Sequence, residues 1–215
     1  MLDGVLPPLI VLLATAGLAA VRHRVPRRRQ VVVTAGSLLA LLVLTAALER
    51  GMGRSWTYQH GPVRFWSGDI ASDQNSQQVA DPYTFTHVNH GILFYGLTQA
   101  LMPAAGVWMR ALLTIGAEAS WEAYENTSTV VERYRAATIS LGYFGDSVLN
   151  SMADIVACGI GFVLARRLPR RWSIAWVLVT EIGLAFWIRD NLTLNLVMLV
   201  HPFDVIRRWQ SGLSI

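Results

Sequence analysis

The residues that could do chemistry gather in two stretches whose polar side chains recur at helical spacing. Residues three or four positions apart share one face of a helix, so each set would form a stripe. The two stripes consist of Glu118, Glu122 and Glu125, and of Asp146, Asn150 and Asp154. Carboxylates in such a pattern can exchange protons with a substrate or bind a divalent cation.

We assign three roles from these patterns. The predicted catalytic residues are Glu118, Glu122, Asp146 and Asp154. The predicted metal ligands are His87, His90, Glu122 and Asp146. The predicted substrate contacts are Arg133, Arg135, Asn150, Glu125 and Asn126. A divalent metal here could activate water or polarise a phosphoryl group, and the arginines could hold an anionic head group. The metal is a hypothesis, and the cofactor otherwise stays unknown.

Two other interpretations of the acids stay open. Acids inside a membrane often mark a proton or ion path. Alternatively, they pair with arginine, asparagine and backbone groups and only hold the helices together. The sequence contains no zinc-protease spacing, phosphate-binding glycine-rich loop or nucleophile elbow, so no known catalytic motif decides between these possibilities.

The elements that would position these residues are membrane helices. The chain has 215 residues, of which 53% are hydrophobic and only 15% charged, and the apolar residues form long blocks. We predict an all-α, polytopic helical bundle that forms one membrane domain over residues 1–215. About six transmembrane helices are expected, at residues 2–21, 31–48, 83–102, 107–125, 145–165 and 173–188.

Two arginine-rich runs predict how this bundle is oriented. Residues 22–29 and 166–171 lie after the first and fifth expected spans, and such runs mark the cytoplasmic side. This places the protein in the bacterial inner membrane with its N-terminus in the periplasm. Both polar stripes then open toward the periplasm. Since the basic runs are explained by topology, we expect no nucleic-acid partner and expect membrane lipids as partners.

The segments outside the spans are also polar or amphipathic. The loop 49–82 is periplasmic, and is either a solvated connector or a lid over the site. The C-terminal segment 192–215 starts with an apolar run too short to cross, and is predicted to be re-entrant or interfacial. The single cysteine, Cys158, excludes an internal disulfide and is expected to be a buried structural thiol.

Four stretches carry a resemblance to a known family: residues 81–91, 118–126, 132–135 and 145–154. Together they resemble an uncharacterised family of proteobacterial inner-membrane proteins with a domain-of-unknown-function label. The acid-rich helix followed by Gly-Asp-x-x-x-Asn-x-x-x-Asp is also similar to VanZ-like membrane proteins. The family resemblance implies an inner-membrane location, and it brings no catalytic residues.

We therefore expect a membrane protein that binds, and could process, an anionic lipid or a polyprenyl-phosphate-type substrate from the periplasmic side. The main alternative is a non-catalytic accessory or assembly subunit of a larger membrane complex. A small transporter is disfavoured because the sequence shows no internal repeat.

Overall fold

The computed structural model describes residues 2–138 and 142–212. Among these residues there are helices and loops and one isolated bridge, between Trp66 and Ala80, but no strand. The predicted all-α fold is therefore confirmed. The helices are α1 (Leu2–His23), the 3-10 turn η1 (Arg27–Arg29), α2 (Gln30–Gly51), α3 (Thr84–Leu101), α4 (Val107–Glu125), α5 (Ser128–Ala137), α6 (Val148–Arg167), α7 (Arg170–Trp187), α8 (Leu192–Val200) and α9 (Asp204–Gln210).

Three of the described helices are long and apolar enough to cross a membrane: Gly4–Arg22, Arg27–Gly51 and Val148–Arg167. A fourth span is formed if α7 and α8, which meet at a bend of 71°, are counted as one. The helices α3 and α4 exist close to their predicted bounds, but the polar residues of the site lower their hydropathy. The chain is thus a membrane-type helical protein, and the count of six spans stays a prediction.

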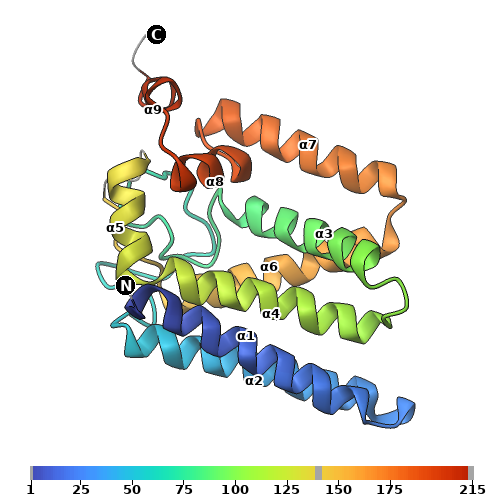
Figure 1. Ribbon diagram of the computed structural model, residues 1–215. Coiled ribbons are helices and arrows are strands. Elements are labelled where there is room, and N and C mark those ends of the chain that lie inside the picture. Colours follow the sequence, from blue (N-terminus) through green and yellow to red (C-terminus); the bar gives the residue numbers. More distant parts are fainter. Residues whose placement is uncertain (1, 139–141, 213–215) are drawn as a thin grey trace.

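The long helices lie side by side in one bundle (Figure 1). Two of them, α3 and α6, come into close backbone contact. A Cβ atom at Gly91 of α3 would lie 1.9 Å from the Cys158 carbonyl oxygen of α6. A Cβ atom at Gly161 of α6 would lie 2.0 Å from the Val88 carbonyl oxygen of α3. Small residues permit this close approach between membrane helices. The crossing therefore fixes α3 and α6 in one register.

The two ends of the bundle differ in chemistry. Both arginine-rich runs lie at one end, together with the short turn between α3 and α4 (Figure 1). The loop 52–83, α5, α8 and α9 gather at the opposite end (Figure 1). The polar stripes belong to this end as well, because they lie in the last part of α4 and around the start of α6. The sequence predicted this separation of basic runs from polar stripes.

Both ends of the loop 52–83 are folded against the start of α6, so the loop is not a solvated connector. Gln77, Gln78 and Asp81 are buried. The backbone N–H of Ser147 donates to the Ser76 carbonyl (2.9 Å), and the N–H of Val148 donates to the Ser55 carbonyl (2.9 Å). These bonds satisfy N–H groups at the start of α6 that lack partners within the helix. The loop therefore caps the helix that carries the second stripe.

Two further elements depart from the predicted outline. The first lies between the predicted spans 107–125 and 145–165, where the structure has the helix α5, whose first turn is capped by the Thr127 hydroxyl accepting from the Val130 N–H. The second is Glu181 of α7, inside the sixth predicted span: its Oε2 accepts from the Thr193 N–H (3.0 Å) and hydroxyl (2.6 Å), so this acid caps the start of α8.

Candidate functional site

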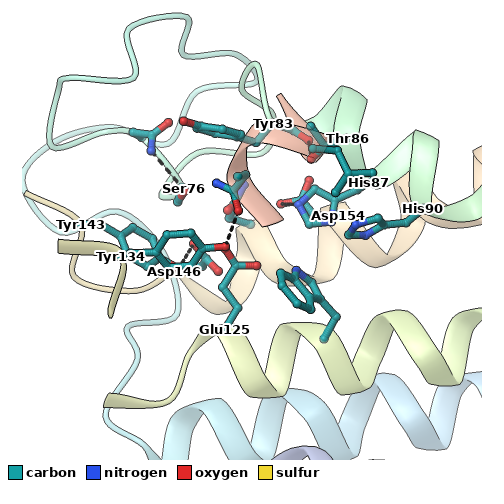
Figure 2. A pocket seen from close by; sticks show the side chains of 15 residues that line it. Ser76, Tyr83, Thr86, His87, His90, Glu125, Tyr134, Tyr143, Asp146 and Asp154 are labelled. Carbon is teal, nitrogen blue, oxygen red and sulfur yellow. Dashed lines mark hydrogen bonds and ion pairs between the residues drawn. The ribbon is translucent and has the colours of Figure 1, made fainter. Parts of the chain in front are cut away.

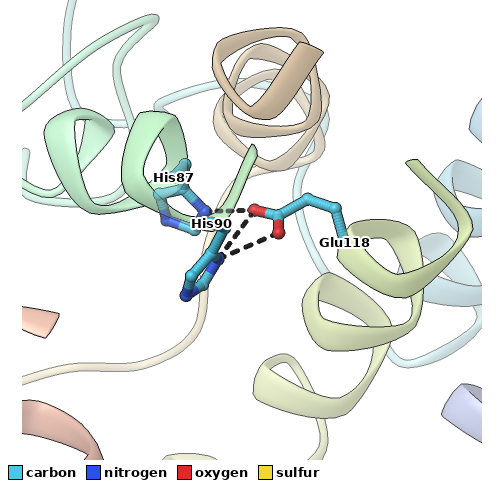
Figure 3. A group of neighbouring side chains, drawn as sticks. All are labelled: His87, His90 and Glu118. Carbon is cyan, nitrogen blue, oxygen red and sulfur yellow. Dashed lines mark hydrogen bonds and ion pairs between the residues drawn. The ribbon is translucent and has the colours of Figure 1, made fainter. Parts of the chain in front are cut away.

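The centre of the site is a buried group of two histidines and one glutamate, in which Glu118 comes from α4 and both histidines come from α3. His87 Nδ1 lies 2.6 Å from Glu118 Oε1, and His90 Nδ1 lies 2.9 Å from Glu118 Oε2 (Figure 3). The three residues are at most 7% exposed. The i, i+3 spacing on α3 is what directs both rings to the same carboxylate.

Two more acids border this group. Glu122 Oε1 lies 3.2 Å from His87 Nδ1, and Asp154 Oδ2, from α6, lies 3.8 Å from His87 Nε2. Glu122 Oε1 and Asp154 Oδ1 are buried and have no hydrogen-bond partner. An ionised carboxylate is costly to bury unless a charge or donor meets it. The cluster thus has capacity for a further cation or proton.

The ligand atoms of His87, His90 and Glu118 all lie within 4.8 Å of one another. Imidazole and carboxylate ligands suit zinc, manganese and iron. This group differs from the predicted metal set: Glu118, predicted as catalytic, takes part, whereas Glu122 lies beside the group and Asp146 lies outside it. The predicted use of both histidines agrees with the geometry.

Asp146 belongs to a separate hydrogen-bond network in the loop ahead of α6. Its Oδ2 accepts from Asn126 Nδ2 (2.9 Å), its Oδ1 accepts from the Tyr143 hydroxyl (2.9 Å), and its N–H donates to Asn126 Oδ1 (2.7 Å). Burial raises the pKa of the Asp146 carboxyl to about 6, although these hydrogen bonds oppose the shift. Asn126, predicted as a substrate contact, therefore positions Asp146.

A cavity of about 50 Å³ lies above the cluster, with room for a few water molecules (Figure 2). Its lining joins the loop, α3, α4, α5, α6 and α8. The lining residues are Asn75, Ser76, Tyr83, Thr86, His87, His90, Trp121, Glu125, Tyr134, Tyr143, Asp146, Asn150, Asp154, Leu192 and Asn195. Both predicted stripes thus reach one cavity: the first stripe contributes Glu125, and the second contributes Asp146, Asn150 and Asp154.

Several lining residues were not predicted. Asn75 and Ser76 come from the loop, Tyr134 from α5, and Asn195 from α8. Ser76 has a left-handed backbone (φ 59°), which is uncommon for a residue other than glycine. The Tyr134 hydroxyl donates to Asn195 Oδ1 (2.9 Å) and joins α5 to α8. No periodic signal marks such residues, because long-range packing brings them together.

The two arginines predicted to hold a head group do not line the cavity. Arg133 donates to the carbonyls of Leu199 (2.9 Å) and Val200 (3.1 Å), which end α8. Arg135 donates to the Tyr143 carbonyl. Arg133 thus satisfies free carbonyls at a helix C-terminus, a favourable place for a cation. The head-group contact of these arginines stays a prediction, and in the structure α5 directs both side chains to backbone carbonyls.

The tail is held to the site by a buried acid. Asp190 Oδ2 accepts from the Tyr83 hydroxyl (3.1 Å), and its Oδ1 accepts from Gln210 Nε2 (3.1 Å). These bonds connect the start of α3 with the end of α9. The C-terminal segment therefore packs over the site, while its predicted depth in the membrane stays a prediction.

Comparison with known proteins identifies relatives over most of the chain. A UPF0314 protein of Rhizobium meliloti (strain 1021) is 46% identical over 174 residues, covering 81% of this chain and 88% of the relative. A UPF0314 protein of Brucella anthropi is 45% identical over 176 residues, covering 82% and 89%. No solved structure matches the chain. The expected likeness to VanZ-like proteins stays a prediction.

The family model described as "Protein of unknown function (DUF2585)" matches residues 49–212, which include the loop, the cluster and the tail. The first two predicted spans, 2–21 and 31–48, precede this match. The match and the relatives together confirm the resemblance seen in the four polar stretches, and the chain belongs to the DUF2585 family of bacterial proteins.

Proposed function

We propose that this chain is an inner-membrane protein whose buried cluster binds a divalent metal and, through it, the anionic group of an amphiphilic substrate such as a lipid phosphate or polyprenyl phosphate. The observation that carries the proposal is the convergence of His87, His90 and Glu118 within 4.8 Å beneath a cavity. Two buried carboxylate oxygens that accept no hydrogen bond, on Glu122 and Asp154, add to it.

The orientation proposed for this site follows from charge. Both arginine-rich connections lie at the end of the bundle opposite the cavity. Under the positive-inside rule that end faces the cytoplasm, so the cavity opens toward the periplasm and the N-terminus lies on the same side. The apolar helices supply the membrane anchor.

The cavity limits which part of a substrate can enter. A volume of about 50 Å³ admits a small polar group and leaves a hydrocarbon chain outside, in the bilayer. A bound metal would supply Lewis-acid polarisation of the substrate's anionic oxygen. Glu122 and Asp154, next to His87, are placed to accept or hold a proton at the same point.

The proposal is tested by metal binding to the full chain purified in a neutral detergent. We expect one zinc or manganese ion per chain after treatment with a chelator and return of the metal, measured by elemental analysis and titration calorimetry. His90→Asn and Glu118→Gln should weaken binding at least tenfold. His201→Asn, a change at an exposed histidine on the tail, is the matched control. Wild-type protein without a bound ion would overturn the metal site.

A second candidate, a non-catalytic subunit of a membrane complex, is favoured by one specific observation. Glu118 is already paired with both histidines, and Asp146 accepts bonds from Tyr143 and Asn126. Such closed pairs also suit a purely structural role. Co-purification of a stoichiometric membrane partner, together with unchanged partner binding in Glu122→Gln and Asp154→Asn, would support this candidate over the first.

A further inference from the structure

The outer part of the cavity combines carboxylates with aromatic rings. Glu125 ends α4, and its carboxylate lies against the Tyr134 hydroxyl and the Trp121 indole (Figure 2). Asp146 enters from the loop ahead of α6, hydrogen-bonded to Tyr143. The Tyr134 and Tyr143 rings meet edge to face with centroids 5.3 Å apart. Carboxylates together with aromatic rings are the chemistry that binds organic cations.

No arginine is among the residues that line this cavity. Glu125, Asp146 and Asp154 all contribute to it, and Asp154 Oδ1 has no hydrogen-bond partner although the residue is only 3% exposed. A metal bound by His87, His90 and Glu118 would neutralise the negative charge of the neighbouring acids Glu122 and Asp154. The outer acids, Glu125 and Asp146, would still need a positive charge, because isolated carboxylates are costly to bury.

Asp146 has acceptor capacity left for such a charge. Each of its oxygens accepts one hydrogen bond, from Tyr143 and from Asn126, whereas a carboxylate oxygen offers about two acceptor positions. The existing bonds hold the carboxylate in place. A cation would therefore meet a prepared acceptor, and little rearrangement is needed.

We propose that the substrate of this site carries a positively charged ammonium group, held between Glu125, Asp146 and the rings of Trp121 and Tyr134, in addition to the anionic oxygen directed to the inner cluster. This inference rests on the proposed function and narrows its substrate class from anionic to zwitterionic amphiphiles. The ammonium recognition needs only the outer residues, so it is testable separately from the metal.

The test compares short-chain phospholipids that share acyl chains and phosphate but differ in the head group. The full chain in maltoside detergent at pH 8, with zinc added, is titrated with dihexanoyl phosphatidylethanolamine and with dihexanoyl phosphatidylglycerol. We expect the ammonium lipid to bind at least tenfold more tightly. Glu125→Gln should reduce the ratio to below about threefold, whereas Glu132→Gln, a change of an exposed acid on α5, should leave it unchanged.

The outcomes separate the two proposals. Equal, metal-dependent binding of both lipids would overturn the ammonium inference and leave the proposed function standing. Tight binding of the ammonium lipid that persists with a chelator would support the inference and overturn the metal. No binding of either lipid would overturn both. Water-soluble phosphoethanolamine is a third arm: affinity equal to that of the lipid would support the inference and identify an aqueous source of the ligand.

Discussion

The crossing of α3 and α6 gives the sharpest prediction for the fold. In Gly91→Ala the new Cβ atom would lie 1.9 Å from the Cys158 carbonyl oxygen and 2.7 Å from the Phe162 nitrogen. Both are backbone atoms, so no side-chain rotation relieves the contact and the helices must separate. Overpacking costs typically 1–3 kcal/mol, and a rigid backbone neighbour places this change at about 3 kcal/mol.

The same helix offers a matched control. Gly96 has nothing within 4 Å of its would-be Cβ atom and is exposed. Because alanine is the better helix former, Gly96→Ala should be neutral or stabilise by about 0.5–1 kcal/mol. The two variants make the same chemical change on one helix and differ only in what the methyl group meets.

The assay is thermal unfolding of the purified chain in detergent, together with the recovery of monodisperse protein. At about 2–4 °C per kcal/mol for a chain of this size, Gly91→Ala should lower the Tm by about 6–12 °C. Its metal affinity should also fall, because Gly91 follows His90 directly. A Gly91→Ala protein with the Tm of the Gly96→Ala protein would show that α3 and α6 do not cross at these glycines.

Two further predictions concern acids, the buried Asp146 and the half-buried Glu181. The folded pKa of Asp146 is about 6 against an ordinary 3.8, so ionisation of this carboxyl destabilises the fold. The contribution of Asp146 to stability is highest below pH 3.8 and falls by about 3 kcal/mol as the pH rises through 6, and Asp146→Asn should remove this part of the slope in denaturant titrations at several pH values. An unchanged slope would contradict the buried position. Glu181→Ala should cost about 1–2 kcal/mol, because the N–H groups of Leu192 and Thr193 lose their acceptor. Limited proteolysis should then release the tail beyond Asn191, and equal protease resistance would refute the cap.

Helical spacing predicted the inner half of the site better than the outer half. The i, i+3 pair on α3 and the i, i+4 acids on α4 face one another because regular helices carry their side chains on known faces. Asp146 lies just before the helix that carries Asp154. The orientation of its side chain is therefore set by hydrogen bonds from Asn126 and Tyr143 and not by the helical repeat. Arg133 was misplaced for a similar reason: the sequence contains no sign that α8 ends where this side chain can reach its carbonyls.

The close backbone contact between α3 and α6 also limits where a ligand can enter the cavity. Two of its walls carry His87, His90 and Asp154 on helices that cannot separate without breaking a backbone contact. Other walls come from the loop, through Asn75 and Ser76, and from α8, a helix of nine residues that follows a 71° bend and contributes Leu192 and Asn195. We therefore expect a ligand to enter by displacement of the loop or of this short helix, while the histidine-bearing side acts as a fixed template.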